Sequence, residues 1–120
     1  MAAPDRQVRA GKATYGGRAL SEWVPDVVDR LVERFAPRKV VLFGSVARGD
    51  DGPDSDIDVL VVLDRLEGRH HDAVIAMLRS LTDLPVPVDV VVTDVAEIED
   101  RARTPGIVRF ALQVGVALHG

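Results

Sequence analysis

The sequence contains no cysteine and few aromatic residues, and both absences narrow what the protein can be. Without cysteine there is no disulfide, no zinc–thiolate site and no thiol catalysis. Aromatic residues make up only 4% of the chain and hydrophobic residues 47%, so Val, Leu, Ile and Ala must do most of the packing in the core. A chain of 120 residues is expected to hold one folded domain.

Long apolar segments are also missing. The longest apolar run, residues 59–63, is far too short to cross a bilayer. Residues 1–11 are polar and lack the apolar stretch of a signal peptide. We therefore expect a cytoplasmic protein that does not associate with membranes.

Basic residues are not gathered anywhere along the chain. The fifteen Lys and Arg residues are scattered, and the formal net charge is −4. Five aspartates fall within nine residues, a local charge that repels a phosphodiester backbone unless cations intervene: Asp50, Asp51, Asp54, Asp56 and Asp58. The sequence thus predicts no direct nucleic-acid groove and suits a metal ion and a nucleotide better.

Hydrophobic periodicity predicts alternating strands and helices after residue 20. Residues 1–20 contain three glycines and little periodicity, so we expect a flexible arm with an exposed Tyr15, followed by one domain at residues 21–120. The expected strands are residues 39–43, 56–63, 88–93 and 115–119. The expected helices are residues 24–35, 45–49, 72–81 and 104–114. One more helix is expected after Asp94, which would cap it, with Glu97 as the capping-box partner.

The most informative stretch is residues 44–58, GSVARGDDGPDSDID, directly after the first predicted strand. Gly44 and Ser45 can form a tight turn at a helix start, where backbone N–H groups bind phosphate. Asp56 and Asp58 stand at positions i and i+2, so on a strand both carboxylates project from one face. A Gly-Ser turn alone is common, but a phosphate cradle beside paired carboxylates is what a Mg²⁺–nucleotide site requires.

A third aspartate strengthens this interpretation. Asp89 lies on the apolar strand at residues 88–93, where a lone carboxylate is costly. If that strand is next to residues 56–63, the three carboxylates converge and can hold two metal ions. The alternatives are that Asp56 and Asp58 lie in a solvated loop end, and that Asp89 is an edge-strand charge that blocks aggregation.

Other polar residues carry weaker signals. Arg48 can neutralise charge on phosphates or pair with a nearby aspartate to brace the loop. Adjacent His70 and His71 cannot share a helix face, and we interpret them as a solvated helix start. Turn and cap roles explain three further aspartates better than a role in a site: Asp64, Asp83 and Asp94.

These residues give the chain a resemblance to a known family. It resembles the minimal nucleotidyltransferase (MNT) branch of the polymerase-beta-like superfamily, whose signature G-S-x10-D-x-D is matched by Gly44, Ser45, Asp56 and Asp58. The longer form FGSxARGxxxxxSDxDxxV is also matched, and it includes Arg48, Ser55 and Val61. The third carboxylate of the family corresponds to Asp89, and residues 104–120 resemble the family's closing helix and strand. The likeness covers about residues 24–119.

The resemblance implies a mixed sheet flanked by helices, and transfer of a nucleoside monophosphate from an NTP with pyrophosphate leaving. Gly44 and Ser45 would hold the β- and γ-phosphates, with Arg48 and Ser55 as further nucleotide-binding residues. Asp56 and Asp58 would bind two Mg²⁺ ions. Asp89 would bind one of them and help deprotonate the attacking hydroxyl.

Small free-standing members of this kind resemble antitoxins that are paired with HEPN-domain toxins. The resemblance thus implies AMP transfer from ATP to a tyrosine of such a toxin. Two other functions stay open at this point. One is a non-catalytic module that masks its partner by contact alone, and the other is a small-molecule nucleotidyltransferase of the aminoglycoside-modifying type.

Overall fold

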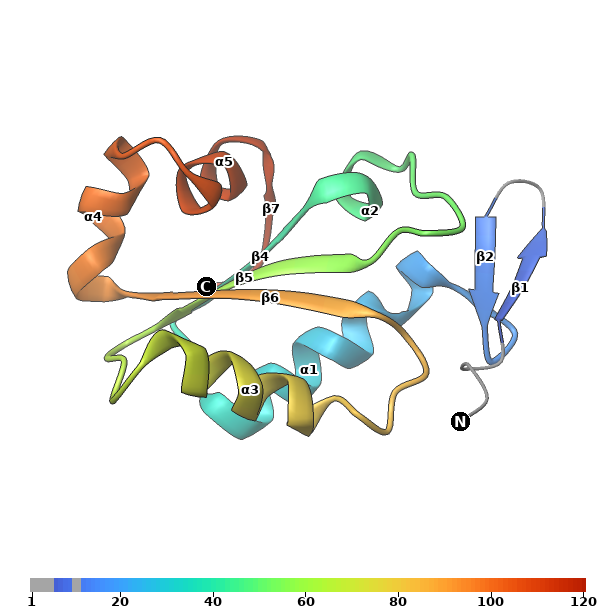
Figure 1. Ribbon diagram of the computed structural model, residues 1–120, viewed down its shortest axis with the longest axis horizontal. Coiled ribbons are helices and arrows are strands. Elements are labelled where there is room, and N and C mark those ends of the chain that lie inside the picture. The colour runs from blue at the N-terminus through green and yellow to red at the C-terminus, as the bar shows by residue number, and fades with distance from the viewer. Residues whose placement is uncertain (1–5, 10–11) are drawn as a thin grey trace.

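A four-stranded mixed sheet forms the centre of the molecule (Figure 1). The structure, a computed structural model, describes residues 6–9 and 12–120. The strand order is β6–β5–β4–β7, with β4 antiparallel to both β5 and β7, and β5 parallel to β6. The bounds are β4 Lys39–Phe43, β5 Ile57–Leu63, β6 Val88–Asp94 and β7 Val116–His119. The expected fold class, a mixed sheet flanked by helices, is confirmed.

Strand β5 is buried on both faces because its side chains enter two separate hydrophobic clusters. Ile57, Val59 and Val61 belong to one cluster, whereas Leu60 and Val62 belong to the other. Successive strand residues point to opposite faces, so a strand that is apolar at both sets of positions needs a cover on each side. Only the beginning of β5 departs from this pattern, at Asp58.

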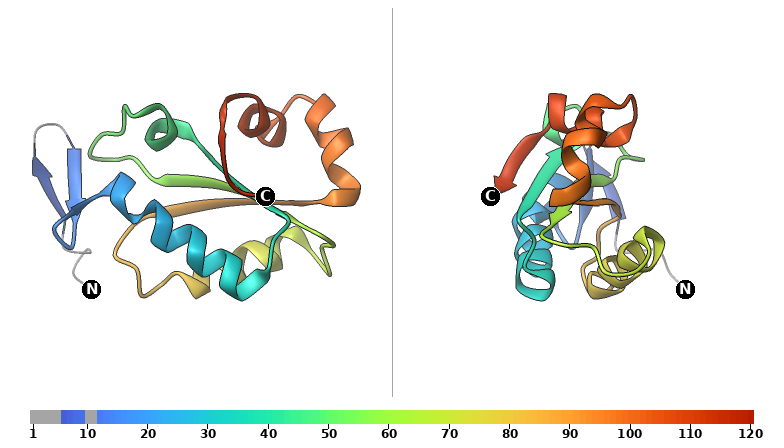
Figure 2. Two further views of the ribbon diagram at one scale, coloured as in Figure 1. Left: turned by 180° about the vertical axis from the view of Figure 1, so that it is seen from behind. Right: turned by 90° about the vertical axis from the view of Figure 1, so that its left-hand side faces the viewer.

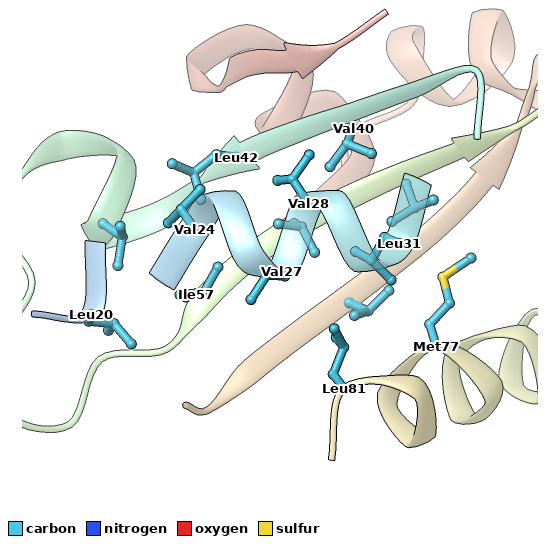
Figure 3. Packing of buried hydrophobic residues seen from close by; sticks show 14 of the residues in the cluster. Leu20, Val24, Val27, Val28, Leu31, Val40, Leu42, Ile57, Met77 and Leu81 are labelled. Carbon is cyan, nitrogen blue, oxygen red and sulfur yellow. The ribbon is translucent and has the colours of Figure 1, made fainter. Parts of the chain in front are cut away.

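Two helices cover the first face of the sheet, α1 at Val24–Phe35 and α3 at His70–Ser80. Helix α1 buries residues at helical spacing, namely Val24, Val27, Val28 and Leu31. Figure 3 shows these side chains packed against Val40 and Leu42 of β4, with Met77 and Leu81 closing the cluster from the α3 side. Each fully buried Val or Leu stabilises the fold by about 1.5–3 kcal/mol.

Two helices lie on the second face, α4 at Val95–Arg103 and α5 at Ile107–Val114. The short helix α2, at Gly44–Arg48, follows β4 at the end of the sheet, and its buried Val46 belongs to the first cluster. Figures 1 and 2 show α5 between α4 and α2 along the long axis of the molecule. Val108 and Ala111 of α5 are buried in the second cluster beside Leu60 and Val62. Within the described residues, no helix is long and apolar enough to span a membrane.

Most predicted elements are present, with shifts at their ends. Helix α1 and strand β4 have the expected bounds. Helix α5 begins at Ile107 instead of residue 104, and β5 begins at Ile57, so Asp56 lies just before the strand. Such shifts of one to three residues are usual, because the ends of elements depend on contacts outside them.

The expectation of a flexible arm through residue 20 with an exposed Tyr15 is wrong for its later residues. Tyr15 is only 3% exposed and joins the first hydrophobic cluster, and its carbonyl oxygen accepts a hydrogen bond from Trp23 Nε1 at 2.9 Å. Arg18 stacks over the Trp23 ring at 4.0 Å and pairs with Asp26 at 2.8 Å. Residues 1–5, 10 and 11 of the expected arm lie outside the described residues.

This segment forms a second, small antiparallel sheet of β1 (Arg6–Arg9), β2 (Lys12–Tyr15) and β3 (Arg18–Ala19). Between β2 and β3, Gly16 and Gly17 have φ of 55° and 80°. A two-residue hairpin turn with positive φ at both positions strongly prefers glycine. The Gly-Gly pair was thus a readable hairpin signal, and it outweighs the low apolar periodicity of the segment.

Candidate active site

The register of the sheet brings two of the predicted site residues together. In the parallel pairing of β5 and β6, Asp58 stands directly beside Asp89. In the antiparallel pairing of β4 and β5, Phe43 stands opposite Asp58, so Gly44 follows at the same end of the sheet. Neighbouring register positions put their side chains on the same face. Residues 88–93 form the predicted strand, and the condition set for the convergence of Asp89, that this strand is next to residues 56–63, is met.

Gly44 lies so close to Asp58 that a residue with a side chain would displace the Asp58 carboxylate. Its φ is +79°, and a Cβ atom built at this position would collide with Asp58 Oδ2. An L-amino acid with a side chain would be strained by the positive φ as well. The glycine therefore lets the backbone of the β4–α2 turn lie directly against the carboxylate of Asp58.

Ser45 is the second residue of α2, and the helix is short because it ends at a glycine. Gly49 has φ of 81° and Asp50 N donates to Ser45 O at 3.1 Å, which closes the helix after five residues. The backbone N–H groups of the first helical turn have no partner within the helix itself. They lie at the end of the sheet where Asp58 and Asp89 begin their strands.

Asp58 is a carboxylate whose surroundings disfavour its charge and raise its pKa. Burial raises its pKa most, the negative charges of Asp89 and Asp56 raise it further, and Arg48 partly offsets them, so the pKa is about 6 instead of 3.8. In the described part of the chain no group donates a hydrogen bond to Asp58. A half-buried carboxylate that faces two others is stabilised by a cation.

Three other predicted residues lie around this pair in exposed or half-buried positions. Asp56 is exposed just before β5. Ser55 Oγ accepts a hydrogen bond from Gly52 N at 2.8 Å and closes a turn in the loop. Arg48 pairs with Asp50 at 3.2 Å and also stabilises the charge of Asp58. Of the two roles considered for Arg48, the structure contains the bracing pair.

The donor set fits Mg²⁺ if substrate oxygens complete it. Among the described residues, no three carboxylate or imidazole groups come close enough to form a metal cage of their own. Protein sites for Mg²⁺ seldom use such cages, because the ion keeps waters and takes one or two carboxylates together with substrate phosphates. The carboxylates of Asp58 and Asp89, next to the backbone turn at Gly44, are a donor set of that kind.

Two surface pockets lie away from the candidate site, with volumes of about 510 and 330 Å³. The larger one lies between α4 and α5 and the smaller one between the end of α1 and α3, and neither is lined by any predicted site residue. Enclosed small-molecule sites are usually concave pockets of this size range. Neither pocket therefore provides an enclosed acceptor site beside Asp58.

The aspartates assigned to turns and caps have those roles. Asp64 pairs with Arg38 at 2.7 Å, and Asp83 binds the Arg30 guanidinium, which lowers the Asp83 pKa. Asp94 caps α4 by accepting from Glu97 N at 2.9 Å. The expected reciprocal capping bond from Glu97 is not found in the described structure, because the Glu97 carboxylate pairs with His70 at 2.9 Å instead.

The His70–Glu97 pair also corrects the interpretation of the two adjacent histidines. His70 and His71 begin α3, as a helix start, but His70 is partnered across to α4 and is not simply solvated. His71 is exposed. The pair joins two helices at the end of the sheet away from Asp58, so it belongs to the structure and not to the candidate site.

Comparisons with known proteins agree with this geometry. The family model of the nucleotidyltransferase domain matches residues 24–118. Among solved structures, the chain is similar to a Sulfolobus solfataricus protein assigned as a nucleotidyltransferase. The two share 27% sequence identity and a TM-score of 0.56, over 82% of this chain and 78% of that chain. No curated protein matches the sequence.

Proposed function

This chain belongs to the nucleotidyltransferase domain family, and from that premise we propose that it transfers AMP from ATP to a tyrosine hydroxyl of a HEPN-domain toxin. Family membership supports nucleotidyl transfer in general, while the nucleotide, the metal and the acceptor belong to the proposal. The observation that carries it is the placement of Asp58 beside Asp89, with Gly44 against Asp58. One end of the sheet then presents both a carboxylate pair and the backbone N–H groups of the first turn of α2, which have no acceptor within that helix.

The turn at the start of α2 would hold the triphosphate. Backbone N–H groups of its first turn and the Ser45 hydroxyl are donors for phosphate oxygens. Gly44 keeps the backbone of this turn directly against Asp58, so a phosphate held by the turn would lie beside that carboxylate. Arg48, which already interacts with the charge of Asp58, would also face the negative phosphates.

The carboxylates would hold the metal and take up a proton. Asp58 and Asp89, with Asp56 just before β5, would hold Mg²⁺, and the ion would neutralise charge on the phosphates. Asp89 would also accept the proton of the acceptor hydroxyl. The hydroxyl oxygen then forms a bond to the α-phosphorus, the bond from that phosphorus to its bridging oxygen breaks, and pyrophosphate leaves. Positioning and charge neutralisation supply most of the acceleration in such reactions.

The two surface pockets favour a protein acceptor over a small molecule. Neither pocket is lined by a predicted site residue, whereas enclosed small-molecule sites are usually concave pockets. The sequence likeness to MNT antitoxins adds the class of partner.

The test uses the purified chain, a HEPN-domain partner and ATP labelled at either the α- or the γ-phosphate. We expect the partner to be labelled from α-labelled ATP only, with Mg²⁺ required, and the modified tyrosine to be identified by mass spectrometry. Asp58→Asn is the inactive variant. Asp94→Asn is the matched control, because it changes the same residue type at the other end of the sheet.

Three results would contradict the proposal. Label from the γ-phosphate would mean phosphoryl transfer. Absence of label on the partner, with the wild-type chain, ATP and Mg²⁺ present, would remove the proposed acceptor. If Asp58→Asn neutralises the toxin as well as the wild type does, the protein acts by masking its partner and not by catalysis.

A further inference from the structure

The chain has five aromatic residues, and one of them stands apart by its exposure. Phe110 is 43% exposed, whereas Phe43 and Tyr15 are buried and Trp23 and Phe35 are half-buried against the core. A protein with so few aromatic side chains places this one on the surface of α5. Its position relative to the candidate site suggests what it can contact.

Helix α5 has an exposed apolar stripe as well as its buried side. Val108 and Ala111 are buried against the sheet. Ile107, Phe110 and Val114 recur at helical spacing, and each is 43–49% exposed. A helix with apolar residues on a side that the sheet does not cover can bury that side only against something else.

The stripe borders the candidate site through Phe43. The rings of Phe110 and Phe43 meet edge to face, with centroids 6.4 Å apart and an interplanar angle of 84°. Phe43 is the last residue of β4, directly before Gly44, and it stands opposite Asp58 in the sheet. Phe110 therefore lies on the side of α5 toward α2, on the same face of the sheet as Asp58.

We propose that Phe110 is the stacking surface for the base of the bound nucleoside triphosphate, with Ile107 and Val114 beside it. This inference rests on the proposed function and adds which residue contacts the base. Phe110 contacts the residue directly before Gly44, so it is an aromatic ring close to phosphates held at the start of α2, and Figures 1 and 2 show α5 and α2 along the same side of the molecule. An exposed, flat apolar ring suits a base, because every base has a π-face.

The experiment compares two ligands, ATP and inorganic tripolyphosphate, each with Mg²⁺ and measured by calorimetry. Both present three linked phosphates, but only ATP has a base. The variants are Phe110→Ala, Phe110→Trp and the control Val95→Ala, which truncates a side chain 41% exposed at the far end of the sheet. Thermal unfolding of each variant shows that it is folded.

We expect Phe110→Ala to weaken ATP binding about tenfold, within the range known for base–aromatic stacking. Tripolyphosphate should bind to this variant as it does to the wild type, because its phosphates do not reach α5. Phe110→Trp should bind ATP as the wild type does, since the indole ring replaces the stacking surface. Val95→Ala should change the affinity for neither ligand.

The inference is overturned if Phe110→Ala binds ATP normally, or if its affinities for ATP and for tripolyphosphate fall by the same factor. Normal ATP binding combined with lost transfer to a protein acceptor would also overturn it, since Phe110 would then contact the acceptor. These results leave the proposed function standing. If the wild type binds neither ligand, the proposed function itself fails, so the two failures are distinguishable.

Discussion

Two aspartates at opposite ends of the β5–β6 pair have opposite electrostatic environments. Asp94, at the end of β6, accepts hydrogen bonds from Leu66 N at 3.0 Å and Glu97 N at 2.9 Å, and these bonds lower its pKa. Asp58, near the start of β5, has burial and two neighbouring carboxylates, which raise its pKa to about 6. The fold satisfies the first carboxylate by itself and leaves the second in need of a cation.

This difference separates a carboxylate whose charge is used within the fold from one that is a candidate for function. Asp94 joins the loop before α3 to the start of α4, so its charge is used within the fold. The charge of Asp58 is unfavourable in the protein alone, and a bound cation would offset this free energy. The four predictions below test the contrast, from the largest expected effect to the smallest.

Replacing Asp58 should abolish catalysis, while the same change at Asp94 should not. Asp58→Asn is expected to lower the rate of AMP transfer by about 100- to 1,000-fold, because a charge that acts on the reacting phosphates is lost. Asp94→Asn should leave the rate per folded molecule nearly unchanged. The measurement is pyrophosphate release at saturating ATP. Equal losses in the two variants would mean that Asp58 acts only through the fold.

The same Asp58→Asn variant should be more stable than the wild type when no metal is present. With a folded pKa of about 6 against an ordinary 3.8, the carboxyl of Asp58 favours the folded state at low pH and loses that contribution as the pH rises through about 6. The gain from the asparagine should thus be near zero at pH 3 and about 1–3 kcal/mol at pH 8. Urea unfolding in EDTA measures it, and a gain that is the same at both pH values would contradict the raised pKa.

Removing the carboxylate of Asp94 should lower the stability of the fold, and this loss should be larger at neutral than at acidic pH. Asp94→Ala leaves two backbone N–H groups without their acceptor, so we expect the Tm to fall by a few degrees at pH 7. A lowered pKa stabilises the fold above the ordinary carboxyl pKa, and this contribution is lost as the pH falls through the folded value. The decrease in Tm should therefore shrink below pH 4. Thermal scans at several pH values measure it, with ATP binding as the control for an intact site.

The smallest effect should come from the pair between α3 and α4. Glu97→Gln weakens the contacts of that carboxylate with His70 at 2.9 Å and Arg101 at 3.5 Å. Both contacts are partly exposed to solvent, so the free energy of unfolding should fall by less than about 1 kcal/mol. Nucleotide affinity should not change, because the pair lies at the Asp94 end of the sheet. A loss of affinity would mean that the two ends are coupled.

Local patterns were sufficient to predict the elements that carry the site. The spacing of Val24, Val27, Val28 and Leu31 determines an amphipathic helix, and the alternation in β5 determines a strand covered on both sides. Glycine at position 44 could be expected next to a phosphate site from the motif alone. The periodicity of residues 107–114 predicted a helix, but it did not show that Ile107, Phe110 and Val114 would remain exposed.

The sequence by itself determined the helices, the main strands and the chemical groups of the candidate site, because those depend on neighbours within a few residues. Only the tertiary structure decided that Asp58 stands beside Asp89, that Gly44 touches Asp58, and that Tyr15 is buried. Each of these contacts joins residues that come from different elements. Strand order and register depend on how whole faces pack together, and no short window of sequence contains that information.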